Sequence, residues 1–137
     1  MMTLMAWITF STSVSPPKID VESIRESRCM ANAIFYEARG EGMSGRKAVF
    51  DVVMNRSNKN KRSICSVMSE KNAFSWYSKQ PLKPISNEMR KLLTETANAR
   101  TILSSNYYNF YSGKRPSWAS SMLCRRIGNQ HFCKEKK

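Results

Sequence analysis

The sequence predicts a single α+β domain in which a small helical unit comes first and a short antiparallel sheet follows. Apolar residues recur at steps of three and four from residue 20 to residue 103, the spacing of one helix face. Beyond residue 106 the pattern changes to short runs rich in aromatic residues, with Gly113 and Gly128-Asn129 at the turns. Helices followed by strands indicate the α+β class, and 137 residues suffice for one core.

A Ser-Pro-Pro linker at residues 15–17 divides the chain into a tail, residues 1–18, and a folded domain, residues 19–137. The apolar stretch of the tail, residues 4–10, is far too short to span a bilayer. It follows no basic segment and precedes no A-x-A cleavage site, so a signal peptide is not convincing. We favour a disordered tail over a weak export or membrane-touching segment.

Four helices are expected, each with a start or stop signal. The first is capped by Asp20, runs to about Ala38 and stops at Gly40, and the second is capped by Ser44 and ends at the polar run 55–60. The third is short and covers residues 63–69, and residues 72–84 form a surface loop. The fourth is capped by Ser86 and carries its apolar face as far as residues 102–103.

Two stretches are expected to form short strands, residues 107–111 and residues 117–133, the second folded back at Gly128-Asn129. A two-residue loop there pairs Ile127 with Gln130, and it places Cys124 opposite Cys133 at a site where side chains approach closely. A disulfide fits this geometry, and in a reducing cytosol the same residues would remain thiols. The two states stay open at this point.

The chain is strongly basic, with 23 Lys and Arg against 10 Asp and Glu and a net charge of +13. Such a surface attracts polyanions, among them nucleic acid, anionic lipid and anionic envelope polymers, although solubility alone would also explain part of it. Four cysteines without a CxxC pair and one histidine, His131, make a poor zinc site. His131 could serve as a base, but no Ser or Cys stands in a recognisable nucleophile setting, so we favour a polar residue at a strand end.

Glu37 is the best candidate for catalysis. It lies at the end of an apolar helical turn, and loss of hydration there favours the protonated carboxyl that glycosidic cleavage needs as a proton donor. The alternative is a helix-border glutamate paired with a neighbouring arginine. Glu41, Asp51, Glu70, Glu88 and Glu95 are the other carboxylates of the fold, and none is an obvious nucleophile. A single-carboxylate reaction, lytic transglycosylation of peptidoglycan, therefore fits best.

Aromatic and polar residues outside the helical pattern are candidates for substrate binding, because rings with polar edges stack on sugars. Core packing is an equal alternative for Phe74 and Trp118. Aromatic residues interleaved with basic residues also suit single-stranded nucleic acid. The substrate-binding candidates are Phe74, Ser75, Trp76, Tyr107, Tyr108, Asn109 and Trp118.

The chain resembles the SleB-type cell wall hydrolases, a group of spore cortex-lytic transglycosylases and related phage lysis proteins. The similar segments follow the family's order and cover most of residues 29–132. They are the EARGE run within residues 33–41, the segments 45–49 and 52–56 of a GQxAVAxVVLNR helix, the VCGVV and QFSW runs at 64–68 and 73–76, and the closing strands at 107–108, 116–118 and 127–129.

The resemblance implies a compact domain related to lytic transglycosylases and lysozyme, with Glu37 as the acid/base. It implies the MurNAc-GlcNAc strand of bacterial peptidoglycan as substrate and no cofactor. The family usually places His directly after its I-G-N, whereas Gln130 stands there in this chain and His131 follows, so a role for that histidine does not carry over. We expect a monomer without a specific nucleic acid partner.

The small size suggests a phage endolysin that waits in the host cytoplasm and acts at the cell envelope. Two other classes of protein remain as alternatives. A basic nucleic-acid-binding module would be indifferent to Glu37 and steeply salt-dependent. An N-acetylmuramoyl-L-alanine amidase usually needs zinc, which one histidine and scattered cysteines disfavour.

Overall fold

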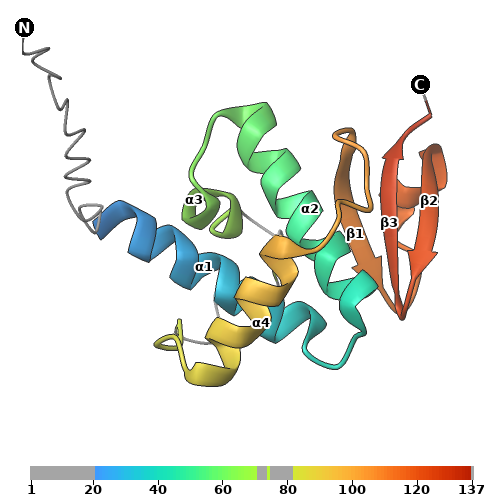
Figure 1. Cartoon of the computed structure of the whole chain (residues 1–137). Helices are drawn as coiled ribbons and strands as arrows, with labels where there is room; N and C mark the ends of the chain where they lie inside the picture. The colour runs from blue at the N-terminus through green and yellow to red at the C-terminus, as the bar shows by residue number, and fades with distance from the viewer. Residues whose placement is uncertain (1–20, 71–73, 75–81, 137) are drawn as a thin grey trace, which may run out of the picture.

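The computed structural model describes residues 21–70, 74 and 82–136, and it places a group of helices beside a small sheet (Figure 1). The predicted tail, the Asp20 cap and most of the predicted loop at 72–84 lie outside the described residues. The α+β class is confirmed. In chain order the elements are α1 (Val21–Ala38), α2 (Met43–Asn60), α3 (Ile64–Met68), α4 (Asn87–Asn98), β1 (Tyr107–Ser112), the 3-10 helix η1 (Ser117–Ser121), β2 (Met122–Ile127) and β3 (Gln130–Glu135).

Two helices begin with a capping serine, and one of these caps, Ser86, was predicted. Ser63 precedes α3, and its hydroxyl accepts a hydrogen bond from the Ser66 backbone N–H at 3.1 Å. Ser86 precedes α4 in the same way and accepts from Met89 N–H at 3.1 Å. Each hydroxyl satisfies a backbone donor that the first helical turn leaves without a partner.

The second helix is longer than predicted, because the polar run 55–60 continues α2 instead of ending it. Its N-cap is Gly42, not Ser44. The Asn55 side chain donates to the carbonyls of Ser104 and Tyr107 at 2.9 and 3.0 Å. These contacts with a distant segment hold residues that have weak helix propensity of their own. The helix ends at Lys61, which adopts a left-handed conformation with φ of 50°.

The fourth helix is shorter than predicted and ends at Asn98, so Ile102 and Leu103 lie in the segment that follows. Their backbone N–H groups donate to one carboxylate oxygen of Asp51 at 2.8 and 3.1 Å. Leu103 is buried in the core. The apolar spacing therefore predicted the burial of Leu103 correctly, but the prediction that the helix reaches residue 103 was wrong. Asp51 holds this stretch in a non-helical conformation through its two hydrogen bonds.

The sheet is antiparallel with β3 in the centre, in the order β1-β3-β2. The predicted register is confirmed, since Ile127 pairs with Gln130 and Cys124 with Cys133. These two cysteines form a disulfide with a Cα–Cα distance of 4.0 Å. The segment from residue 117 to 121 was expected as strand and is instead η1, which begins directly after Pro116.

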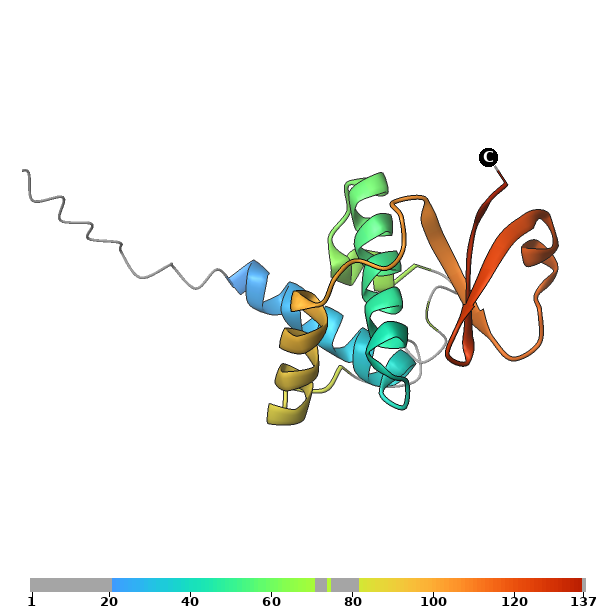
Figure 2. The ribbon, with the colours of Figure 1, turned by 45° about the vertical axis from the view of Figure 1, so that its right-hand side comes forward.

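The core lies between the helices and one face of the sheet, and Figure 2 shows the sheet standing to one side of the helices. Phe132 of β3 is fully buried there and stacks on Phe110 of β1 at 5.6 Å between ring centroids. A second disulfide, Cys29–Cys65, joins α1 to α3. Within the described part of the chain, no helix is both long and apolar enough to cross a membrane.

Candidate active site

Glu37 lies in the last turn of α1, one residue before the helix ends, and its side chain is half-buried. The carbonyls of a last helical turn have no partner within the helix. The carbonyl of Glu37 instead accepts a hydrogen bond from the Gln130 side-chain amide at 2.9 Å. Gln130 is itself buried, and it opens β3. The first strand residue after the hairpin thus fixes the end of the helix that carries Glu37.

Glu41 makes a second link between the end of α1 and the β2–β3 hairpin. Its carboxylate oxygens lie 3.3 and 3.4 Å from the backbone nitrogen of Asn129. A Cβ atom on Gly128 would lie 2.1 Å from the nearer oxygen, and one on Gly45 would lie 2.7 Å from the Glu41 Cβ. Glu41 therefore fits between two glycines, and its role is to hold the hairpin.

Basic and aromatic side chains surround the end of α1. The Arg39 guanidinium lies 4.8 Å from the ring centre of Phe35, and the Lys83 ammonium lies 5.3 Å from the same ring and 6.0 Å from that of Tyr36. Arg39 also pairs with Glu88 of α4 at 3.5 Å. This part of the surface offers rings and positive charge together.

Several other carboxylates have structural partners. Asp51 is buried and binds the backbone N–H groups of the segment after α4, and Lys47 lies 3.9 Å from it. Glu70 pairs with Arg56, and with Arg62 at 2.8 Å. The remaining two carboxylates of the predicted set lie on α4, where Glu88 and Glu95 are exposed.

The predicted substrate-binding residues before α4 are not brought together on a described surface. Phe74 is only 4% exposed and packs against Phe110 at 6.0 Å between centroids, so it lies in the core. Ser75 and Trp76 lie outside the described residues. Their role in binding remains a prediction.

Tyr107, Tyr108 and Asn109 lie at the first end of β1, beside the C-terminal end of α2. The Lys59 ammonium is 4.2 Å from the ring centre of Tyr108. Both residues line two small pockets of about 200 and 270 Å³. Glu37, near the end of α1, lies close in sequence to the opposite, N-terminal end of α2, and an 18-residue helix is about 27 Å long. A ligand contacting both sets would have to extend along α2.

Trp118 and His131 lie on the other face of the sheet. Tyr111 of β1 pairs with His131 of β3, and their rings are stacked 4.8 Å apart. The Trp118 indole meets Tyr111 edge to face at 5.8 Å. Of the predicted aromatic residues that the structure describes, Trp118 is the one that is strongly exposed, at 42%.

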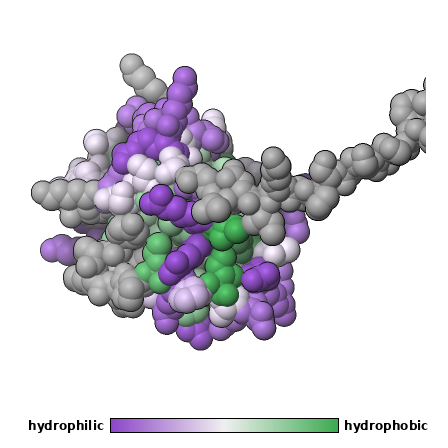
Figure 3. Space-filling model, turned by 90° about the vertical axis from the view of Figure 1, so that its left-hand side faces the viewer, coloured by the Kyte–Doolittle hydropathy of each residue, from purple (hydrophilic) through white to green (hydrophobic). Residues whose placement is uncertain are grey.

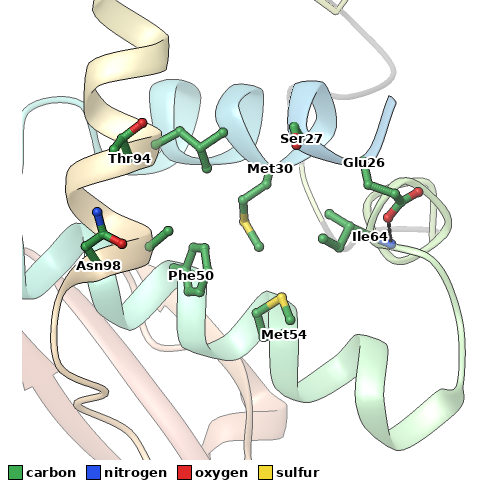
Figure 4. Close-up of a pocket in the computed structure, with 10 residues that line it drawn as sticks. Glu26, Ser27, Met30, Phe50, Met54, Ile64, Thr94 and Asn98 are labelled. Carbon is green, nitrogen blue, oxygen red and sulfur yellow. Dashed lines mark hydrogen bonds between the residues drawn. The ribbon is translucent and has the colours of Figure 1, made fainter. Parts of the chain in front are cut away.

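A larger cavity of about 540 Å³ lies elsewhere, between α1, α2 and α4 (Figure 4). Apolar side chains gather on the face of the molecule seen from the left of Figure 1 (Figure 3). None of the predicted catalytic or substrate-binding residues lines this cavity. Its lining residues are Glu26, Ser27, Met30, Phe50, Met54, Ile64, Leu93, Thr94, Ala97 and Asn98.

Sequence reasoning missed Gln130 and Glu41 as residues that build the site. One signal was present: Gly45 lies inside a helix, where the helical pattern gives no reason for a glycine. The contact that explains this glycine and Gly128 involves Glu41, which is 88 residues away from its hairpin partner in sequence. Spacing along one element cannot reveal such a contact.

Comparison with known proteins identifies the fold and the family. Residues 40–133 match the model of the Cell Wall Hydrolase family. The structure is similar to the catalytic domain of the Bacillus cereus SleB protein, with a TM-score of 0.68 and 24% identity over 87% of this chain and 94% of that one. It is equally similar to the catalytic domain of the germination-specific lytic transglycosylase SleB from Bacillus anthracis, with a TM-score of 0.69 and 23% identity over 87% and 99% of the two chains.

No protein with curated annotation matches the chain. The family match covers well over half of the chain, and the structural similarity extends over nearly the whole SleB catalytic domain. The chain belongs to the cell wall hydrolase family and has the fold of the SleB catalytic domain.

Proposed function

We propose that this protein is a peptidoglycan lytic transglycosylase that cleaves the MurNAc-GlcNAc bond, with Glu37 as its single acid/base. Membership in the cell wall hydrolase family supports peptidoglycan as the substrate. The position of Glu37 supports its role, because Gln130 and Glu41 hold the end of its helix against the hairpin. Preorganised positioning of this kind is what a proton donor requires.

The observation that carries the single-carboxylate mechanism is that four other carboxylates already have structural partners. Among the described residues, Asp51, Glu70 and Glu41 bind backbone N–H groups or arginines, and Glu26 accepts from the backbone N–H of Ile64. A displacement that uses two carboxylates needs the second one free across the bond. Glu88, close to Arg39 at the end of α1, is the strongest remaining rival.

The proposed reaction uses one side chain twice. The Glu37 carboxyl donates its proton to the bridging oxygen, the bond from MurNAc C1 to that oxygen breaks, and the GlcNAc 4-hydroxyl leaves. The Glu37 carboxylate then takes the proton from the 6-hydroxyl of the same MurNAc while that oxygen bonds to C1. An anhydro sugar forms, no water is consumed, and the carboxyl is restored.

The basic surface suits the substrate. Arg39 and Lys83 bring positive charge to the end of α1, next to the rings of Phe35 and Tyr36. Peptidoglycan carries carboxylates on its stem peptides, and charge complementarity speeds encounter and orients the polymer. The proposal therefore assigns part of the net charge of +13 to wall binding.

The test compares Glu37→Gln with Glu88→Gln, two nearly isosteric changes at neighbouring helix ends. We expect Glu37→Gln to lower the rate of wall clearing by about 10²–10⁴-fold, the usual contribution of a general acid, and Glu88→Gln to retain the parent rate. Mass spectrometry of the digest then identifies the product. Anhydro-MurNAc ends support transglycosylation, and reducing ends show hydrolysis.

Parent-like clearing by the Glu37→Gln protein would refute the assignment. Loss of activity in both variants would instead indicate a two-carboxylate mechanism. An amidase would release stem peptides with intact glycan. The structure gives that activity little material, because all four cysteines are joined in disulfides and His131 stacks on Tyr111.

The endolysin role, the monomeric state and the lack of a nucleic acid partner remain predictions. Lysis of a bacterial culture that expresses this chain together with a membrane-permeabilising holin, and no lysis without the holin, would support release from the host cytoplasm. Sedimentation of the purified protein measures its oligomeric state. Titration with DNA at several salt concentrations measures the rival activity.

A further inference from the structure

A row of polar and aromatic side chains crosses the face of the sheet that points away from the helices. Tyr111 of β1 lies opposite His131 of β3, and His131 lies opposite Arg126 of β2. The neighbouring positions Phe110 and Phe132 face the core, and successive strand residues point to opposite faces. The row is therefore on the outer face, where η1 also lies (Figure 2).

Trp118 of η1 adds a further ring to this row, in contact with Tyr111. Its indole is perpendicular to the Tyr111 ring, at 5.8 Å and 84°, while the Tyr111 and His131 rings are almost parallel, at 4.8 Å and 9°. An indole that is 42% exposed keeps a large apolar surface in water. Trp118 and Leu123 are the two large apolar side chains of the described sheet region that are exposed to this degree.

The exposed indole is held in place. The next residue, Ala119, is fully buried, and its carbonyl accepts a hydrogen bond from the Arg115 guanidinium at 2.9 Å. The hydroxyl of Ser121 donates to the carbonyl of Trp118 at 3.3 Å. A ring whose position is fixed before binding loses little conformational entropy when a ligand stacks on it.

We propose that Trp118, with Tyr111, His131 and Arg126, forms a second glycan-binding site that stacks a pyranose ring of peptidoglycan outside the bond being cleaved. The flat indole suits the C–H face of a sugar, and the tyrosine hydroxyl and imidazole nitrogens suit its hydroxyl groups. The Arg126 guanidinium, oriented by a 3.0 Å bond from Nε to the Gly128 carbonyl, suits a lactyl or stem-peptide carboxylate. This inference rests on the proposed function for its choice of ligand.

The location of the row explains how it serves the same polymer. His131 directly follows Gln130, whose amide binds the Glu37 carbonyl, and the two side chains point to opposite faces of β3. A glycan bound at the row therefore lies on the opposite face of the sheet from the helix end that carries Glu37. Holding the polymer there raises the local concentration of bonds at the acid without taking part in the reaction.

The test separates binding from catalysis by using Glu37→Gln protein throughout. Its affinity for a peptidoglycan tetrasaccharide is measured by calorimetry, and its retention on purified sacculi by sedimentation. We expect Trp118→Ala to weaken both about tenfold and Trp118→Phe to restore part of the loss. Leu123→Ala is the matched control, because it removes exposed apolar surface on β2 at a position that alternates to the other face.

In otherwise unchanged enzyme, Trp118→Ala should raise KM and leave kcat within about twofold. Unchanged affinity in Trp118→Ala, or an equal loss in Leu123→Ala, would overturn this proposal while leaving the role of Glu37 intact. Conversely, normal wall clearing by Glu37→Gln would refute the proposed mechanism and leave the binding result standing. Failure of the Glu37→Gln protein to bind either probe would overturn the second site.

Discussion

Replacing Gly128 with Ala tests the contact by which Glu41 holds the β2–β3 hairpin. Gly128 has φ of +61°, a left-handed conformation that costs an alanine about 1 kcal/mol or slightly more. The new Cβ would also lie 2.1 Å from a Glu41 carboxylate oxygen, so the carboxylate must move. Its hydrogen bond to the Asn129 backbone is long and partly exposed, so losing it costs about 1 kcal/mol.

Alanine offsets about 0.5 kcal/mol of this by restricting the unfolded chain. The expected loss of unfolding free energy is therefore about 1.5 kcal/mol, which lowers Tm by roughly 4–8 °C in a domain of this size. Urea unfolding of the oxidised protein, followed by circular dichroism, measures the free energy directly. The same change should also reduce wall clearing, because the hairpin positions Gln130 on the Glu37 carbonyl.

A double-mutant cycle identifies the cause. In a Glu41→Ala protein the carboxylate is already gone, so Gly128→Ala should cost only about 0.5 kcal/mol, its φ cost less the unfolded-chain offset. The coupling between the two sites is then about 1 kcal/mol. Equal costs of Gly128→Ala in both backgrounds, within about 0.3 kcal/mol, would refute the claim that Glu41 fills the space beside the glycine.

Two further changes test the helical part of the fold. Asp51→Ala should lower the unfolding free energy by about 3 kcal/mol, because it leaves two backbone N–H groups without their partner and the buried Lys47 without its nearby carboxylate. Urea unfolding measures this loss, and a loss below about 1 kcal/mol would contradict the reasoning. Cys65→Ser should lower the unfolding free energy by roughly 3–4 kcal/mol, because the lost disulfide spans 36 residues, and reduction with dithiothreitol should then cost the variant less than it costs the parent.

Local signals in the sequence predicted local structure well. Ser86 was identified as a cap because a capping hydroxyl acts within three residues of its own position. Gly128-Asn129 fixed the hairpin register for the same reason, and with it the pairing of Cys124 and Cys133. The first helix was found because its apolar face and its glycine stop agree.

The errors arose where distant residues override local preference. Asn55 stays helical because its amide binds carbonyls some 50 residues later, and Leu103 leaves the helical pattern because Asp51 binds its backbone. The Cys29–Cys65 disulfide was not anticipated, since no spacing rule relates α1 to α3. Within the candidate site, Glu37 was found from its own surroundings, but Gln130 was found only from a contact 93 residues away.

In the strand order β1-β3-β2, β2 is an edge strand, and α2 packs mainly along β1, the opposite edge. An edge strand presents unpaired backbone N–H and C=O groups, with which a strand of another chain can pair. In this protein the exposed Arg125 and Arg126 lie on that strand, one on each face. Two copies that approach edge to edge therefore repel each other, and this positive charge disfavours fibrous self-association through β2.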